Sequence, residues 1–521
     1  MPLGPATQLD KAISTYYAGV DSRRTYIQTD KPLYQPGETI WFRADVRSAK
    51  TLTAPGVPTG VTMQLVSPRG AVVATKRVLA QAGVARNVFA VPALLEGGEY
   101  TLKLVADAGA SDEKKIIVNT YEAPRLMKTL ELTRKAYGEG DEVAAAVELK
   151  KQTGEALADH AFTAVVTLDD AEVQRLSLRT DHDGKALVKF ALPAQIARGD
   201  GLLAVLVEDG GVTESIQKRI PIVMKKLQLA VFPEGGELVD GVPGRVYFMA
   251  KSLIGKPADI DGNVVDDQGK IVASFSSIHD GMGRFELTPD ASRRYHVEIT
   301  KPAGITTRVD VPAGKPDGCV LRSVEQASKD TLRIAAVCKT RHRLEIEATL
   351  RHKRLAGGTF NAAAGRPALV ELPIPRTEQG AVRVTLFADS AAPLAERLVY
   401  HGMGSDLKVT LAADKKTYAP RDTVRLHVHT SDPHGRAVKA NIAVAVVDDA
   451  VLSFADDKSA KILAHVYLEP ELGATAADPI EEPNFYFSDK PEAAAAMDAL
   501  LATRGYRKFE WQAVLPQGSV K

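Results

Sequence analysis

The chain contains two cysteines, Cys319 and Cys338, whose chemistry depends on how close the fold brings them. Alternating apolar residues flank both, and residues 327–330 have the composition of a turn. A hairpin folded about the middle of that turn places Cys319 opposite Cys338. Facing residues of antiparallel strands lie about 4.5–5.5 Å apart, which is within disulfide reach. The pair is therefore either a disulfide preserved in an oxidising compartment or two reduced, packed thiols.

Three acidic turns offer oxygen atoms that a calcium ion could use: residues 181–184, 259–262 and 448–449. None of them completes the twelve-residue calcium loop with its distal bidentate glutamate, and turns favour aspartate and glycine for backbone reasons alone. His427 and His429 share one face of a predicted strand, but no third zinc ligand accompanies them. We therefore predict no metal site and no cofactor.

The sequence also lacks the motifs of common enzymes. It has no Gly-x-Ser-x-Gly elbow, phosphate-binding loop or His-Glu-x-x-His helix, so we predict a protein that is not an enzyme and has no catalytic residue. Its 66 Lys+Arg and 65 Asp+Glu residues give a net charge of +1, without the positive field typical of nucleic-acid-binding proteins. No apolar run reaches the roughly 18–20 residues that span a bilayer. The first residues do not form a signal peptide.

A tyrosine-marked turn occurs three times, around Tyr34, Tyr137 and Tyr418. In each copy a proline or glycine turn follows the tyrosine, and then an acid and a β-branched residue open a strand. The first two copies lie about 100 residues apart and the third lies nearly three such intervals further on, which indicates about five repeated units. Apolar and polar residues alternate between turns, a pattern typical of strands with one buried face. The fold class predicted is all-β, a tandem array of about five immunoglobulin- or fibronectin-like β-sandwiches.

The repeats place domain boundaries near residues 122, 222, 313 and 404. They divide the chain into an N-terminal segment (1–21) and five sandwiches, at 22–122, 123–222, 223–313, 314–404 and 405–521. Helical signal is sparse: we expect short helices at 6–17, 458–467 and 491–504, the last opened by Pro491 and closed by Gly505. The fifth sandwich is therefore expected to carry a helical insertion or tail.

The first tyrosine turn closely resembles the signature of the alpha-2-macroglobulin family, at the start of its second macroglobulin-like domain. The matching residues are Asp30, Lys31, Pro32, Tyr34, Pro36, Gly37 and Glu38. Asp448 and Asp449 resemble a phrase of the sixth such domain, and residues 232–239 are similar to the opening of the fourth domain in bacterial members. The resemblance runs from about residue 22 to residue 512.

This resemblance implies the N-terminal arm of a larger extracytoplasmic protein, located in the periplasm, at the cell surface or outside the cell. In the family, such arrays trap proteases after cleavage of an exposed bait segment, and a thioester in the order Cys-x-Glu-Gln couples to the attacker. Neither Cys319 nor Cys338 is followed by that motif, so no thioester residue is predicted in this chain. The implied partners are proteases and the remaining domains of a longer parent protein, not nucleic acid.

Together these features predict the non-catalytic scaffold of a bacterial endopeptidase inhibitor. The alternative is a cell-surface adhesion or assembly module whose sheet edges and loops hold a protein or glycan partner. The sequence beyond Lys521 distinguishes the two. A protease-sensitive tract followed by a thioester motif favours trapping, and an anchoring domain favours adhesion.

Overall fold

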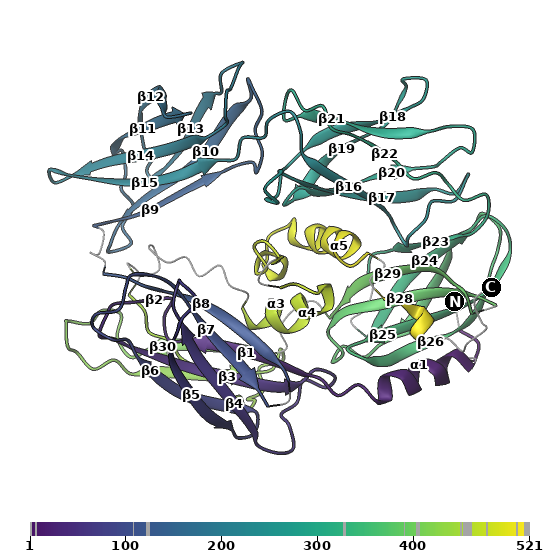
Figure 1. Cartoon of the computed structure of the whole chain (residues 1–521), viewed down its shortest axis with the longest axis horizontal. Coiled ribbons are helices and arrows are strands. Elements are labelled where there is room, and N and C mark those ends of the chain that lie inside the picture. Colours follow the sequence, from purple (N-terminus) through teal and green to yellow (C-terminus); the bar gives the residue numbers. More distant parts are fainter. Residues whose placement is uncertain are drawn as a thin grey trace.

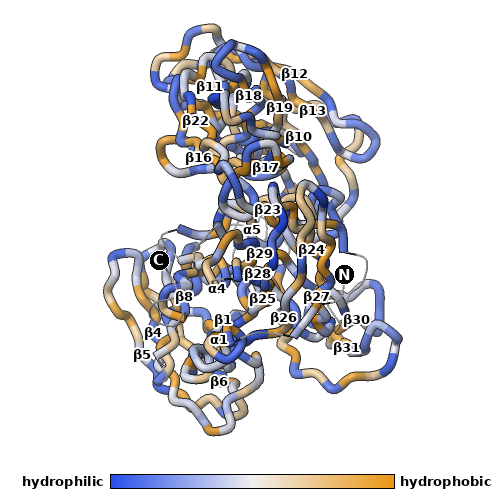
Figure 2. The backbone as a smooth tube through the Cα atoms, turned by 90° about the vertical axis from the view of Figure 1, so that its right-hand side faces the viewer, coloured by the Kyte–Doolittle hydropathy of each residue, from blue (hydrophilic) through white to orange (hydrophobic). Residues whose placement is uncertain are grey.

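The computed structural model describes residues 3–5, 8–107, 109–120, 125–326, 330–389, 391–402, 407–448, 451, 461–475, 478–506 and 509–514. Most of these residues form strands in which buried and exposed side chains alternate, and in Figure 2 apolar and polar residues accordingly intermix along the chain. The predicted all-β sandwich array with a few short helices is confirmed. Four sandwiches surround a short helical segment, formed by the described part of residues 461–506 (Figure 1).

The first sandwich packs a three-stranded sheet, β1-β3-β6, on a five-stranded sheet, β2-β8-β7-β4-β5. Its strands are β1 (Arg23–Thr29), β2 (Leu33–Tyr34), β3 (Thr39–Ser48), β4 (Thr59–Val66), β5 (Val72–Ala80), β6 (Val84–Ala90), β7 (Gly98–Ala106) and β8 (Ser111–Val118). The short strand β2 pairs in parallel with β8, and the other pairs are antiparallel. Side chains from both sheets form one apolar core around Tyr34, Phe89 and Met63.

The second sandwich has the same two-layer plan, with sheets β13-β10-β9 and β12-β11-β14-β15. Its strands are β9 (Leu126–Leu132), β10 (Glu142–Lys151), β11 (Ala161–Leu168), β12 (Ala171–Arg179), β13 (Lys185–Ala191), β14 (Gly201–Asp209) and β15 (Val212–Ile220). Alternate residues of β10 and β14 point into the core that contains Tyr137.

In the third sandwich the strands join in one continuous order, β16-β17-β20-β19-β18-β21-β22. They are β16 (Gln228–Pro233), β17 (Gly244–Lys251), β18 (Asp261–Asp266), β19 (Ile271–His279), β20 (Met282–Leu287), β21 (Tyr295–Lys301) and β22 (Arg308–Asp310). The register shifts where β19 meets β20, between Ser277 and His279. The core contains side chains from both ends of this strand order, among them Phe248 and Val297.

The fourth sandwich consists of the sheets β23-β24-β27 and β26-β25-β28-β29. Its strands are β23 (Cys319–Ser323), β24 (Thr331–Cys338), β25 (His342–Leu350), β26 (Lys353–Ala362), β27 (Ala368–Pro373), β28 (Gly380–Ala388) and β29 (Pro393–His401). Strands β25 and β28 are buried along most of their length. Burial on both faces means that something covers the outer face of this sheet as well.

The predicted fifth sandwich is only partly present in the described residues. Between residues 407 and 448 the structure shows one antiparallel pair, β30 (Lys408–Ala413) and β31 (Leu426–Ser431), with mostly exposed side chains. Figure 1 shows β30 beside the first sandwich, and Asn441 contacts Arg43 and Arg86 there. A complete fifth sandwich stays a prediction, as does the division of the chain into domains at the expected boundaries.

The helices form close to the three residue ranges expected from the sequence, which did not predict what they pack on. Helix α1 (Gln8–Ala18) packs on β26 of the fourth sandwich rather than on the first. The C-terminal elements are α3 (Ile462–Tyr467), α4 (Glu469–Leu472), the 3₁₀ turns η1 (Phe485–Phe487) and η2 (Trp511–Ala513), and α5 (Ala493–Thr503). Helices α3, α4 and α5 pack on the first, third and fourth sandwiches in the middle of the molecule (Figure 1), whereas Trp511 of η2 packs on Phe387 of the fourth sandwich. No helix among the described residues has the length and apolar character needed to cross a membrane.

Candidate functional site

The tyrosine turn that suggested the family is a structural element of the first sandwich. The fully buried Tyr34 donates a hydrogen bond to the Asp30 carboxylate (2.6 Å), which also accepts one from the backbone N–H of Trp41 (3.0 Å). Burial and the adjacent Asp30 carboxylate raise the pKa of Tyr34 well above its usual value. The hydroxyl therefore remains a neutral donor that fixes the turn.

The acid of the same turn closes its other end. Glu38 accepts hydrogen bonds from Lys31 Nζ (2.6 Å) and from the Gln35 backbone N–H (2.7 Å). Although burial opposes the change, these hydrogen bonds lower the pKa of Glu38. Pro36 and Gly37 form the bend before it, and Gly37 has a φ of +90°, a conformation that favours glycine. Pro32 supplies the carbonyl that binds the backbone of β8.

The other two copies repeat these contacts. Backbone N–H groups reach the hydroxyl of Tyr137 (3.1 Å) and that of Tyr418 (3.0 Å), as at Tyr34. The acid four residues after each tyrosine, Asp141 or Asp422, accepts a hydrogen bond from the backbone N–H next to the tyrosine (2.7 and 3.0 Å). The motif thus folds a strand entry, and its polar groups are already bonded within the turn.

Four further residues are singled out from the sequence: Cys319, Cys338, Asp448 and Asp449. Cys319 lies opposite Cys338 in the register that the hairpin predicts, and a disulfide joins their buried side chains. Asp448 accepts a backbone hydrogen bond from Val451, whereas Asp449 lies outside the described residues.

Two of the turns considered for calcium, at 181–184 and 259–262, use aspartate carboxylates to bind backbone N–H groups. Asp181 accepts hydrogen bonds from the backbone N–H groups of Asp183 (2.9 Å) and Lys185 (2.8 Å) within its own turn. Asp259 binds backbone N–H groups of Gly281 and Lys135. These carboxylates therefore order backbone rather than gather around one point.

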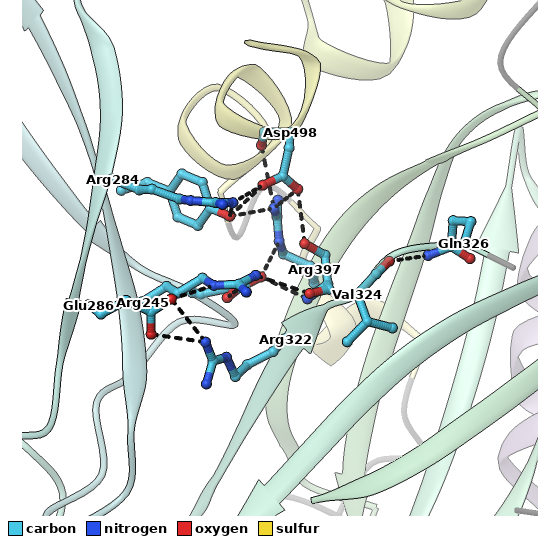
Figure 3. A network of polar contacts seen from close by, with 11 residues as sticks. Arg245, Arg284, Glu286, Arg322, Val324, Gln326, Arg397 and Asp498 are labelled. Atoms are coloured by element: carbon cyan, nitrogen blue, oxygen red, sulfur yellow. Dashed lines mark hydrogen bonds and ion pairs between the residues drawn. The ribbon is translucent and has the colours of Figure 1, made fainter. Parts of the chain in front are cut away.

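A network of buried polar contacts lies where α5 meets the third and fourth sandwiches (Figure 3). Arg397 of β29 is only 3% exposed and binds Asp498 of α5 (2.5 Å) and Glu234 at the end of β16 (3.1 Å). One cation thus joins three elements that belong to three parts of the chain. We call Arg397, Glu234, Asp498 and Tyr247 the central clamp.

Further groups complete the central clamp. The Asp498 carboxylate accepts hydrogen bonds from Ser323 (3.0 Å), from Arg284 (3.2 Å) and from the Tyr247 hydroxyl. The Arg397 guanidinium also lies over the Tyr247 ring, 5.0 Å from its centroid, a favourable cation–π geometry. Every member therefore has at least one oppositely charged or hydrogen-bonding neighbour, as a buried charge requires.

The electrostatic consequences follow from burial and pairing. Burial acts to raise the pKa of Asp498, but the Arg397 charge and the hydrogen bonds outweigh it, so that the pKa is lowered. Burial likewise opposes charge on Arg397, yet Asp498 and Glu234 raise its pKa. Burial raises the pKa of Tyr247 to about 12. Near neutral pH, Asp498 and Arg397 are therefore charged and Tyr247 is a neutral hydroxyl.

Small residues let α5 approach the sandwiches closely. Ala496 and Ala499 are fully buried, and Met497, Leu500 and Leu501 complete an apolar surface against Tyr247, Met282, Leu398 and Tyr400. Just beyond the helix, a side chain at Gly505 would stand 2.3 Å from Leu398 Cδ1. Sequence reasoning missed the central clamp, although a lone aspartate in an alanine- and leucine-rich helix is a signal for a buried partner.

A second contact fixes α3 and α4 on the first sandwich. His465 lies within 2.8 Å of the Thr25 carbonyl of β1, 3.4 Å from Asp112 of β8 and 2.9 Å from Glu469. Although burial opposes it, pairing with Asp112 and Glu469 raises the pKa of His465 to about 10. Arg24 adds an ion pair to Glu471 of α4. The helical segment thus bridges the first sandwich to the third and fourth.

Comparisons with known proteins agree on one family. The MG2 domain family matches residues 24–118. An alpha-2-macroglobulin of Ralstonia nicotianae is 24% identical over 509 residues, covering 87% of this chain and 31% of its own length.

Solved structures give the same name with low similarity. Trypsin-activated alpha-2-macroglobulin from Escherichia coli is 13% identical with a TM-score of 0.47, covering 84% of this chain and 34% of its own. Salmonella alpha-2-macroglobulin reacted with methylamine is 15% identical with a TM-score of 0.39, covering 86% and 34%. The chain therefore spans about a third of the length of these relatives.

Proposed function

We propose that the chain, whose residues 24–118 match the MG2 domain family and which is similar to alpha-2-macroglobulins, is the non-catalytic scaffold of an extracytoplasmic protein that inhibits endopeptidases by trapping them. The observation that supports this most directly is the central clamp, in which Arg397 ties α5 to two sandwiches. Such a clamp holds the sandwiches in a fixed arrangement, as a cage wall requires. The cleaved segment and any covalent chemistry would belong to other parts of a longer protein.

The test of trapping uses the protein expressed from its complete reading frame. After incubation with trypsin, we expect cleavage of casein to fall while cleavage of a small chromogenic peptide persists, because a cage excludes large substrates only. Trypsin with a blocked active site is the control. Because it cannot cleave the protein, it should not be trapped and should elute separately from the protein in size-exclusion chromatography. Unchanged casein cleavage would contradict trapping and favour the adhesion alternative, and loss of both activities would indicate a conventional active-site inhibitor.

The disulfide supports the extracytoplasmic location. A bridge between Cys319 and Cys338, 19 residues apart, closes a loop and is expected to stabilise the fourth sandwich by about 2–4 kcal/mol in an oxidising compartment. Non-reducing mass spectrometry of the exported protein should show no alkylatable thiol at either position. Two alkylated cysteines would contradict the bridge and remove this support.

A further inference from the structure

A compact group of metal-binding side chains lies away from the central clamp, where the helical segment meets the second and third sandwiches. His279 ends β19, Asp280 begins the turn to β20, and Glu482 lies just before η1. One ligand atom from each, the imidazole nitrogen or a carboxylate oxygen, lies within 4.8 Å of the other two. No other group of three potential metal ligands comes this close together among the described residues.

Two of these atoms face each other without forming a hydrogen bond. Asp280 Oδ2 lies 3.3 Å from His279 Nε2, and neither atom has a hydrogen-bond partner in the described part of the chain. The Asp280 side chain is only 4% exposed. A buried carboxylate oxygen without a donor is costly, and a bound cation is one way to satisfy it.

The local backbone holds these two residues rigidly. Asp280 and Gly281 both have positive φ, at 49° and 71°, as a two-residue hairpin turn requires. A side chain at Gly281 would stand 2.2 Å from the Ala250 carbonyl oxygen, so the turn is pressed against β17. The His279 ring stacks on Phe485 with centroids 3.7 Å apart, which fixes the imidazole as well.

Lys135 from the second sandwich orders the carboxylates from the other side. Its Nζ binds Asp280 Oδ1 and lies 2.6 Å from Glu482 Oε1, which leaves Asp280 Oδ2 directed at His279. Lys135 thus binds one oxygen of each carboxylate, and the other Asp280 oxygen is left for a further cation.

We propose that His279, Asp280 and Glu482 form a zinc site that ties the helical segment to the third sandwich. Tetrahedral zinc with bonds of about 2.0–2.2 Å places its ligand atoms about 3.4 Å apart, close to the present separation of His279 Nε2 and Asp280 Oδ2. An imidazole with two carboxylates suits zinc better than calcium or magnesium, which favour oxygen-only sites. Glu482 is half exposed and can close on the ion, and water completes the coordination.

Titration calorimetry of the chelator-stripped 521-residue chain with zinc chloride tests this proposal. We expect one equivalent to bind, and His279→Gln and Glu482→Gln each to weaken binding at least about tenfold, because each removes one of three ligands. His296→Gln is the matched control, since His296 pairs with Glu298 at 2.9 Å outside the proposed site. That variant should bind zinc as the unaltered chain does.

Thermal unfolding supplies a second readout that does not depend on heat of binding. Zinc should raise the unfolding temperature of the unaltered chain and of His296→Gln, but not of His279→Gln or Glu482→Gln. Because Glu482 is half exposed, its variant is expected to fold even if the His279 variant does not. Unchanged zinc affinity in the Glu482 variant, no saturable binding, or a preference for calcium over zinc would each overturn the proposal.

Discussion

Arg397 shows how one buried charge can organise a junction. Its guanidinium is almost inaccessible, and its two carboxylate partners come from positions 163 residues before it and 101 residues after it. Exchange of a complete buried ion pair for apolar residues is often neutral, but removal of one partner leaves an uncompensated charge. We therefore expect Arg397 to matter mainly because it fixes which elements pack together at this junction.

Replacement of Arg397 tests that role. We expect Arg397→Met to lower the free energy of unfolding by about 3–5 kcal/mol, because Glu234 and Asp498 lose their shared cation inside the protein. Urea unfolding measures the change. The control is Arg69→Met, which breaks a solvent-exposed pair with Glu96 and should cost less than about 1 kcal/mol. Equal effects of the two variants would contradict the importance of the central clamp.

His465 gives the junction a pH dependence of known sign. Its pKa is about 10 in the fold and 6.5 as an ordinary histidine, so the folded protein favours the protonated ring. The resulting stabilisation is fully present below about pH 6.5 and is lost as the pH rises through 10. Urea midpoints between pH 6 and pH 10 should therefore fall more steeply for the unaltered chain than for His465→Gln. Parallel pH profiles would contradict the pairing with Asp112 and Glu469.

At the scale of elements, α5 packs between the third and fourth sandwiches and consists mostly of small and apolar residues. Its buried face includes Ala496 and Ala499, which keep the helix axis close to β17 and β29. The helix carries Asp498 to Arg397, so apolar packing and the ion pair reinforce the same position. Disruption of the apolar packing is therefore expected to weaken the ion pair, and loss of the ion pair to weaken the packing of α5.

A larger side chain on the buried face should displace the helix. We expect Ala496→Leu to cost about 1–3 kcal/mol through overpacking and to speed amide exchange across residues 493–503. Ala495→Leu places the same side chain on the exposed face of the helix and should leave exchange unchanged. Hydrogen-exchange mass spectrometry compares the two. Similar protection in both variants would show that α5 is not packed as described.

The sequence predicted those elements whose causes are local. Alternation identified strands such as β10, helix punctuation identified α5, and the contacts of Tyr34 lie within a few residues of it. The docking of α5 could not be predicted, since it depends on side chains more than 100 residues away. The proposed zinc ligands escaped notice for the same reason, because Glu482 is remote from His279 in sequence.

At the scale of the whole molecule, the helical segment connects sandwiches that are not neighbours in the sequence. The helical segment touches the first sandwich through His465 and the third and fourth through α5. Helix α1 adds a contact between the N-terminal segment and the fourth sandwich, where Arg354 binds Asp10 (3.0 Å). Figure 1 shows the four sandwiches arranged around α3, α4 and α5. A tandem array linked only through its connections would bend, whereas this one is braced from within.

The distance between the first and third sandwiches tests this bracing most directly. Spin labels on Ala93→Cys and Lys270→Cys, both exposed, report that distance by pulsed electron resonance in the full chain. We predict a single narrow distance distribution that broadens when Arg397→Met is added. A broad distribution in the chain without that substitution would show that the sandwiches move independently, and would contradict a rigid scaffold.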